Sequence, residues 1–350
     1  MNTSLFPALN LIRTFAILLV MLNHNLCKNI GPLQDIFVVL GKAGVPLFLL
    51  LTGYLNGSKT VEDYYVHGKW KRCIDIMIAY VVLGTLCYFG VRFFDGKSYS
   101  IGNYMQKLLS YHATENGWYI NMWIGLFFMT PLINAMITGL KYANINYKIG
   151  EKKKQLSGIE IAILTFIALT SLPAFTNRNG NNILPDYWII AFPVTFYLIG
   201  HYIRSVQWKL KRNHLITVIA TIVVGESLMN IVTGNKCYLY FYGGHDSLVY
   251  LVLAVALFLL LKDFSMGNRG RMVVNKIAAL SLNIYLIGYL FDSIFHSLWC
   301  SSLDYQWAYL YFPYNVACFV ASITASLGIA YLYDLLYKNI KNKFQSIKNK

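Results

Sequence analysis

Long apolar runs alternate with short polar connections along the whole chain. Most runs hold about 18 to 24 residues, close to the number that an α-helix needs to cross the hydrocarbon core of a bilayer. We therefore predict an all-α, polytopic integral membrane protein with one membrane-embedded domain over residues 1–350. Ten transmembrane helices are expected, at residues 5–27, 36–55, 73–94, 118–138, 158–175, 187–203, 214–233, 247–261, 273–299 and 313–337.

Composition and charge placement refine this picture. The chain is 57% apolar and 13% charged, and its net charge of +15 would also suit a nucleic-acid binder. However, 22 of the 30 Lys and Arg residues lie in or next to the even-numbered connections and the C-terminal tail, against five in the odd-numbered connections. This asymmetry follows the positive-inside rule. It predicts cytoplasmic termini, a multi-pass protein of the inner (cytoplasmic) membrane, contact with membrane lipids, and no nucleic-acid partner.

The first run and the cysteines add two expectations. Residues 5–27 are expected to stay as a first helix rather than to be a cleaved signal, because no basic residue precedes the run and Arg13 interrupts it. The six cysteines show no metal-ligand spacing, so no metal site is predicted. Cys27, Cys237 and Cys300 fall near one membrane face. Two interpretations stay open: some of these cysteines form a disulfide at that face, or all of them are ordinary apolar residues within helices.

Two ionisable side chains lie on one face of the first predicted helix. Arg13 and His24 are eleven residues apart, which is three helical turns plus roughly 20° and about 16 Å along the axis. An arginine at mid-helix costs about 2.5–3.5 kcal/mol on insertion, so it is normally retained for a partner, a ligand or a water-filled cavity. We predict a cavity shared by both residues. The alternative is that Arg13 snorkels inward and His24 binds a neighbouring carbonyl.

Other polar residues in or near the spans are further candidates. Lys42 lies near a predicted helix end and is expected to reach the membrane interface. Glu226 is an acidic residue inside the seventh helix and could balance an inward-facing cation or position a substrate. Asp292 and His296, four residues apart, could form a hydrogen-bonded pair towards the outer side. His245, with the aspartate that follows it, is expected to be an ordinary solvated helix start.

Motifs in the first two helices resemble those of the acyltransferase 3 family of integral membrane acyltransferases. The first helix carries RTFAILLVMLNH and the second GVPLFLLLTGYL, in which glycines permit close packing and Pro46 disrupts the hydrogen-bond ladder. Weaker matches follow in order over essentially the whole chain: WYINMWIGLFFMTPLI, FPVTFYLIGHYI and LSLNIYLIGYL.

The resemblance implies a ten-helix protein that moves an acyl group, often acetyl, from cytoplasmic acyl-CoA to a hydroxyl of a cell-envelope or secreted carbohydrate. Acyl-CoA would be a substrate, with no permanently bound cofactor. By motif, Arg13 and His24 match the paired residues of the first helix. Thr52 stands where a serine is usual, which preserves the hydroxyl. Lys69 and Arg72 are the nearest fit to a basic pair before the third helix.

Three positions depart from the family pattern. Leu49 replaces the second of two phenylalanines in the second helix, which is a change in packing. Gly288 occupies a place where many relatives carry a histidine, and Asp75 falls where another basic residue is common. The roles that family members give to the residues at these two later positions are therefore not assigned to Gly288 and Asp75.

The residues suit acyl transfer chemically. A neutral imidazole with a pKa near 6.5 can take the proton of an attacking hydroxyl, so His24 is the predicted base or, alternatively, the site of a transient acyl-imidazole. Arg13, Lys69 and Arg72 are predicted to bind the CoA phosphates. The predicted substrate-contacting residues are Thr52, Glu226, Asp292 and His296.

Two functions follow from these residues. We predict a membrane O-acyltransferase that uses acyl-CoA, with acetyl-CoA the expected donor, and a glycan acceptor that is free or lipid-linked. The alternative is a transporter of a small solute or a lipid-linked saccharide, in which Arg13, His24 and Glu226 would form a substrate or proton path. No convincing inverted repeat supports that alternative.

Overall fold

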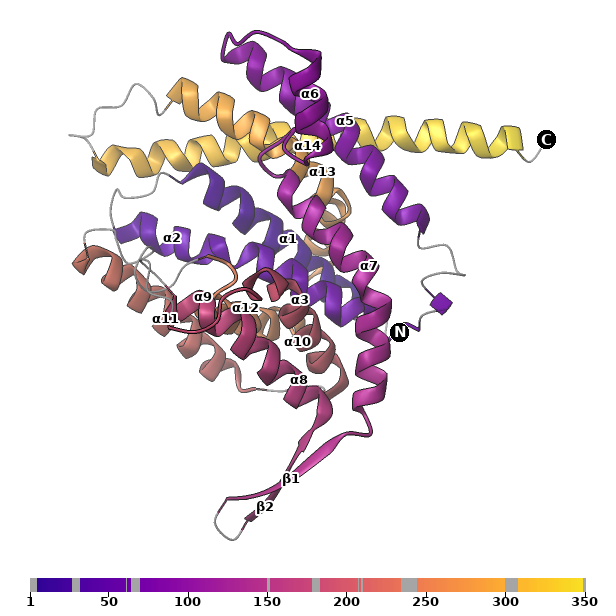
Figure 1. The fold of residues 1–350 in the computed structure, drawn as a ribbon. Helices are drawn as coiled ribbons and strands as arrows, with labels where there is room; N and C mark the ends of the chain where they lie inside the picture. Colours follow the sequence, from indigo (N-terminus) through magenta and orange to yellow (C-terminus); the bar gives the residue numbers. More distant parts are fainter. Residues whose placement is uncertain are drawn as a thin grey trace.

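The computed structural model describes residues 5–26, 32–60, 62–63, 70–149, 152–177, 183–206, 208, 210–233, 244–299 and 308–348. It is 83% helical, which confirms the all-α prediction (Figure 1). The elements are α1 (Leu5–Asn25), α2 (Pro32–Lys42), α3 (Gly44–Asn56), α5 (Trp70–Phe94), α6 (Ile101–Leu109), α7 (Gly117–Leu140), β1 (Asn144–Ile149), β2 (Lys152–Ser157), α8 (Gly158–Phe166), α9 (Leu172–Thr176), α10 (Phe192–Val206), α11 (Arg212–Val232), α12 (Leu248–Lys262), α13 (Asn268–Trp299) and α14 (Ala308–Lys348).

Nine helical stretches in the described part of the chain are long and apolar enough to cross a membrane, which confirms a multi-pass protein. The eighth predicted span, residues 247–261, corresponds to α12, which has 15 residues and is the one predicted span outside these nine. At 1.5 Å per residue it is about 22 Å long, shorter than the ~30 Å hydrocarbon core. Its side chains are largely buried, so α12 packs within the protein rather than facing lipid over its whole length.

The second predicted span is one membrane crossing made of two helices. α2 ends at Lys42 and α3 begins at Gly44. Pro46 has no backbone N–H to donate, so it fits the first turn of a new helix better than the middle of a continuous one. At the break, a Cβ on Gly44 would lie 2.6 Å from Val20 and 2.8 Å from the carbonyl oxygen of Ala16. The break therefore lies where α3 touches α1.

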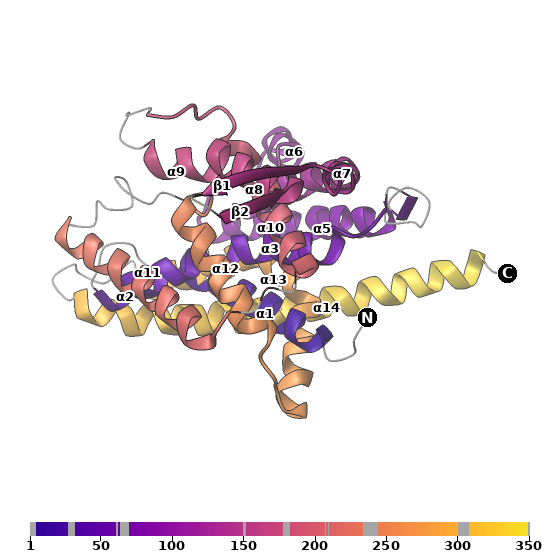
Figure 2. The ribbon, with the colours of Figure 1, turned by 90° about the horizontal axis from the view of Figure 1, so that it is seen from below.

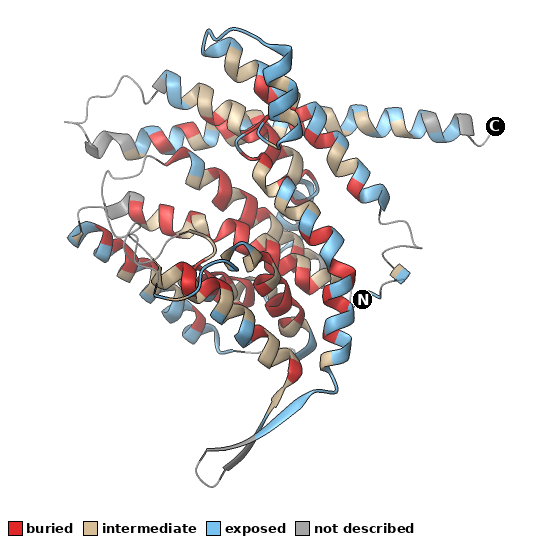
Figure 3. Ribbon diagram, in the orientation of Figure 1, coloured by how far each residue is buried: buried red, intermediate tan, exposed pale blue. Residues whose placement is uncertain are grey.

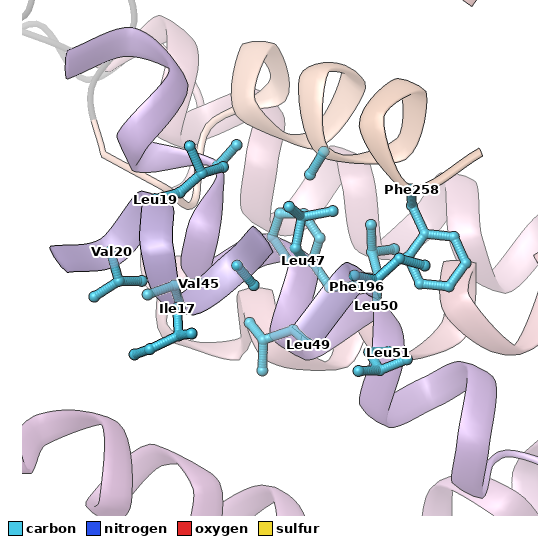
Figure 4. Close-up of a cluster of buried hydrophobic side chains, with 14 of the residues drawn as sticks. Ile17, Leu19, Val20, Val45, Leu47, Leu49, Leu50, Leu51, Phe196 and Phe258 are labelled. Carbon is cyan, nitrogen blue, oxygen red and sulfur yellow. The ribbon is translucent and has the colours of Figure 1, made fainter. Parts of the chain in front are cut away.

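The core lies at the contacts of α1, α3, α10 and α12 (Figures 3 and 4). α3 and α10 approach each other most closely at two glycines. A Cβ on Gly53 would lie 2.0 Å from the carbonyl oxygen of Tyr197, and one on Gly200 would lie 2.1 Å from that of Leu50. Small residues of this kind let membrane helices pack backbone to backbone. This contact fixes the end of α3 relative to α10.

Apolar side chains cover the outer faces of the peripheral helices. α5 exposes Ile74, Ile78 and Val82, and α11 and α14 expose similar residues. In Figure 3 these helices carry much of the exposed surface around the buried centre. Exposed apolar surface on this scale is what lipid tails cover in a membrane protein.

Three features extend beyond the bundle. α14 has 41 residues and is about 60 Å long, so its C-terminal part projects past the other helices (Figures 1 and 2). The antiparallel hairpin of β1 and β2 follows α7 and projects from one end of the bundle in Figure 1. The short helix α6 lies between α5 and α7 along the chain. Neither α6 nor the hairpin was predicted from the apolar pattern.

Candidate active site

A cavity of about 460 Å³ lies among α1, α3, α5, α7 and α13. This volume falls within the range of ~300–1,000 Å³ that is typical of small-molecule sites. Its lining combines cations, hydroxyls, aromatic rings and aliphatic side chains: Arg13, Val45, Phe48, Leu51, Thr52, Leu55, Asn56, Lys59, Arg72, Ile76, Tyr119, Ile120, Trp123, Leu126, Phe127, Thr130, Ser281, Leu282 and Tyr285.

Three cationic side chains line the cavity. Arg13 comes from α1 and is partly buried, whereas Arg72 is exposed near the start of α5. Arg72 is close enough to Arg13 to interact with it electrostatically. Lys59 follows the end of α3. Clustered like charges repel unless an anion joins them, so this group is suited to a ligand that carries phosphates. Lys69, which was predicted to join the group, lies outside the described residues.

Aromatic rings and hydroxyls form the walls. The ring of Tyr119 packs edge-on against Tyr285 at 5.3 Å and lies 6.2 Å from Phe48. The Thr52 hydroxyl donates to the Phe48 carbonyl oxygen at 2.8 Å, which leaves its oxygen free to accept a hydrogen bond. Trp123 stacks on Phe127 at 5.3 Å. These walls can hold the apolar part of a ligand whose charged part meets the cations.

His24 lies outside the described lining of this cavity. It is the penultimate residue of α1 and is exposed. The eleven residues between it and Arg13 correspond to about 16 Å along the helix axis. The structure thus brings Arg13 and Arg72 to one cavity and places His24 at the other end of the same helix.

The residue after His24 is tied to α13 and α14. Asn25 is buried, and its Nδ2 donates to Asp292 Oδ1 at 2.7 Å and to the Met21 carbonyl oxygen at 2.8 Å. Ser322 of α14 donates to the Asn25 side-chain oxygen at 3.4 Å. Asp292 is buried in this network, while His296, one turn further along α13, is exposed. Asp292 therefore helps to fix the end of α1 that carries His24.

Glu226 belongs to a second polar cluster, away from the cavity. Its side chain is 6% exposed and accepts a hydrogen bond from the Tyr250 hydroxyl at 3.2 Å. The Lys42 ammonium lies 5.6 Å from the centre of the Tyr250 ring and acts electrostatically on Glu226. The Lys42 side chain thus lies near the Tyr250 ring and the Glu226 carboxylate, and its reach to the membrane interface stays a prediction. The break between α2 and α3 turns Lys42 towards the buried rings and carboxylate of α11 and α12.

His245 is not a solvated helix start. Its ring stacks on Trp118 at 5.0 Å and meets Phe192 edge-on at 5.4 Å. Burial between these rings lowers the pKa of the imidazole; Asp246 opposes this shift, and nearby Lys42 adds a smaller lowering effect. The structure thus makes His245 a packing residue that joins α12 to α7 and α10.

The sequence was compared with protein families, curated proteins and solved structures. The sequence model of the acyltransferase 3 family, an acyltransferase domain, matches residues 6–331 of the 350. This chain belongs to the acyltransferase 3 family. No curated protein and no solved structure matches it. Membership makes the chain a multi-pass membrane acyltransferase with an acyl donor and an acceptor, and it favours the enzyme over the transporter.

The structure gives a physical setting for two departures from the acyltransferase 3 pattern. A Cβ at Gly288 would lie 2.6 Å from the Met21 sulfur, so the methionine of α1 fills the place where a longer residue would point. Asp75 accepts hydrogen bonds from Tyr337 at 2.6 Å and from Lys341 at 2.8 Å. The acid therefore docks the extended part of α14 against α5.

Several lining residues were missed by the sequence reasoning. Asn56 is the last residue of α3 and Lys59 follows the helix, where a lysine looks like any other residue of a basic connection. Tyr285 and Trp123 are aromatic residues inside apolar runs, and nothing in the apolar pattern separates them from packing residues. The one available signal was the position of Lys59, only four residues beyond the predicted second helix that carries the motif.

Proposed function

We propose that this acyltransferase moves an acetyl group from acetyl-CoA to a hydroxyl of a carbohydrate, as an O-acetyltransferase. The observation that carries the proposal is the joining of Arg13, Arg72 and Lys59 in one cavity whose walls are apolar and aromatic. CoA has the matching chemistry, because a phosphate-rich nucleotide continues into an uncharged arm that ends in the thioester. Guanidinium groups bind phosphates through paired, charge-assisted hydrogen bonds.

The donor is proposed to enter from the cytoplasmic side. Lys59 and Arg72 are two of the four Lys and Arg residues at positions 56–72, and such basic connections face the cytoplasm under the positive-inside rule. The phosphates would contact these residues and Arg13. The arm that carries the thioester would then run past Thr52 and Tyr119 towards the end of α1 that carries His24. On this orientation His24 lies towards the outer side.

For the transfer itself, His24 is the proposed general base. The acceptor hydroxyl oxygen attacks the thioester carbonyl carbon, its proton passes to the imidazole, and the C–S bond breaks to release CoA, which takes up the proton. A transient acyl-imidazole on His24 would divide the same chemistry into two steps. Either way, the acyl group must pass beyond the described cavity, because His24 lies about 16 Å from Arg13 along α1.

The acceptor is proposed to be a cell-envelope or secreted glycan, free or lipid-linked, that approaches from the outer side of the inner membrane. Asp292 supports this role indirectly by holding the outer end of α1 through Asn25. His296 is exposed on the same helix as Asp292, and its proposed role is to contact the acceptor. Glu226 lies outside the cavity, and its proposed role is to balance Lys42 rather than to bind the donor.

Acetyl transfer by the purified enzyme tests the proposal. We expect radiolabel from acetyl-CoA to reach a surface polysaccharide of the source cell, and His24→Ala to slow this transfer by about 10²- to 10⁴-fold, the usual contribution of a general base. His214→Ala is the matched control, since it removes an exposed histidine of α11. Transfer by His24→Ala at the wild-type rate would remove His24 from the mechanism.

Donor binding can be measured separately from transfer. A ligand that binds only the folded protein raises its melting temperature. We expect acetyl-CoA to stabilise the wild-type protein, and Arg13→Met to raise the concentration required. No stabilisation at any concentration up to the millimolar range, together with no transfer, would contradict CoA as the donor carrier.

A further inference from the structure

The segment that follows α3 lies at the edge of the donor cavity. Asn56, the last residue of α3, and Lys59 both line the cavity. Their side chains contact each other, with the Lys59 ammonium donating to Asn56 Oδ1 at 2.7 Å. A lysine ammonium has three N–H donors, so this bond orients the side chain and leaves two donors for a ligand.

A buried asparagine of α7 holds this segment in place. Asn134 Nδ2 donates to the backbone carbonyl oxygens of Asn56 at 3.0 Å and Lys59 at 2.7 Å. Both N–H groups of its amide are thereby used. Asn134 is only 4% exposed, so its bonds are shielded from competing water. The segment from Asn56 to Lys59 is therefore a fixed turn rather than a free connection.

A second buried residue orients the asparagine. The hydroxyl of Tyr197, which is fully buried in α10, donates to Asn134 Oδ1 at 2.8 Å. This bond determines which end of the amide faces the turn. The backbone contact of α3 and α10 at Gly53 brings Tyr197 to this position. Thus α3, α7 and α10 together support one half-buried ammonium group at the cavity.

We propose that Lys59 binds a phosphate group of the acyl donor, with Asn134 and Tyr197 as its positioning residues. The proposal rests on the CoA thioester donor argued above and adds a residue outside the family motifs. Lys59 shares the cavity with Arg13 and Arg72, so one phosphate-bearing ligand can meet all three cations. A point charge with rotatable donors suits a terminal phosphate that has no fixed planar geometry.

Truncated donors provide the test. Steady-state kinetics would compare acetyl-CoA, acetyl-3′-dephospho-CoA and acetyl-pantetheine, which carries no phosphate. We expect Lys59→Met to raise KM for acetyl-CoA at least tenfold with little change in kcat, and to leave kcat/KM for acetyl-pantetheine unchanged. Lys59→Arg should restore most of the affinity. Lys141→Met removes a lysine at the end of α7 that does not line the cavity, and should match the wild type with every donor.

The three donors also identify the phosphate. If Lys59 binds the 3′-phosphate, Lys59→Met and removal of that phosphate will raise KM by no more together than either does alone. If it binds the pyrophosphate, the two effects will multiply. The proposal is overturned if Lys59→Met impairs acetyl-pantetheine as strongly as acetyl-CoA, or impairs neither. Failure of the wild type to use any of the three donors would instead contradict the proposed function.

The positioning residues give an independent readout. Tyr197→Phe and Asn134→Leu should raise KM for acetyl-CoA by a smaller factor than Lys59→Met, and each should have little further effect when combined with Lys59→Met. Donor selectivity is the decisive quantity, because a general loss of folded protein would lower the rate with all donors equally. Equal losses with acetyl-CoA and acetyl-pantetheine would make the two residues purely structural.

Discussion

At the scale of single residues, burial decides what an ionisable group does in this acyltransferase. Arg13 and Lys42 are both cations within predicted spans, yet Arg13 lines the cavity and Lys42 lies over the ring of Tyr250. The low-dielectric interior makes each of these charges costly without a partner or a ligand. Arg13 can therefore bind a ligand that enters the cavity, whereas the groups that interact with the Lys42 charge, Tyr250 and Glu226, belong to the protein itself.

His245 gives a prediction that depends on pH. Burial lowers the pKa of its imidazole in the folded protein, so the unfolded chain binds more protons once the pH falls below about 6.5. Folding stability should therefore decrease as the pH falls from about 6.5 towards the lowered folded-state pKa. Above pH 7 the residue is neutral in both states and contributes no pH dependence. Melting temperatures between pH 5 and 8 would measure this in the detergent-solubilised protein.

The matched variant is His245→Gln, which keeps a polar side chain but cannot titrate. It should melt at a lower temperature than the wild type at pH 8, because the stacking on Trp118 is lost, and this difference should shrink as the pH falls. Lys42 and Asp246 face the same imidazole and are present in both proteins. A difference that stays constant across the pH range would show that His245 is not buried as a neutral group.

At the scale of elements, the helix contacts determine the shape of the site, and the apolar pattern does not contain them. The pattern located the spans, because roughly 20 apolar residues suffice to cross a bilayer. Pro46 predicted a disrupted hydrogen-bond ladder in the second span, but not that one helix ends and another begins around Ala43, since a proline near a helix start and one in a helix middle look alike in sequence. Nor could the pattern show that α7 supplies Asn134 to the end of α3, which depends on pairing of segments far apart in the chain.

The contact between α3 and α10 gives the second prediction. Gly53→Ala would place a Cβ 2.0 Å from a backbone carbonyl oxygen of α10, and backbone cannot yield as a flexible side chain can. We expect a loss of stability of about 3 kcal/mol or more, in the upper range of overpacking. Gly125→Ala in α7 is the control, because a Cβ there meets nothing within 4 Å, and helix propensity favours it by up to about 1 kcal/mol.

Thermal unfolding in detergent, read with donor binding, would measure both variants. Gly53→Ala should melt earlier and also bind acetyl-CoA more weakly, because α10 carries the Tyr197 that orients Asn134. Equal melting temperatures for the two variants would contradict the close backbone contact. A normal donor affinity in a destabilised Gly53→Ala would separate the packing of α3 and α10 from the phosphate subsite.

At the scale of the whole molecule, charge and apolar surface together define how the protein lies in the membrane. The basic connections alternate with neutral ones, and the exposed apolar faces of α5, α11 and α14 supply the lipid contact. Sequence alone was sufficient to predict a multi-pass membrane protein, since the apolar signal is a sum over many residues. The orientation, which rests on the basic connections, stays a prediction. Sequence was insufficient for the site, where single contacts such as that of Lys59 with Asn56 decide the geometry.

The last prediction concerns the orientation of the whole bundle. If CoA carries the acyl group, the cavity with Arg13, Lys59 and Arg72 must open towards the cytoplasm, where CoA is found. In a cysteine-free background, Ser98→Cys would label the connection between α5 and α6, and Asn146→Cys would label the hairpin after α7. Both positions are exposed, and α7 separates them by one membrane crossing. The hairpin carries several lysines, so the positive-inside rule places it in the cytoplasm.

A membrane-impermeant maleimide applied to intact cells should react with Ser98→Cys alone. After permeabilisation it should react with both variants. Labelling of Asn146→Cys in intact cells would reverse the bundle, turn Arg13, Lys59 and Arg72 away from the CoA pool, and contradict the donor path.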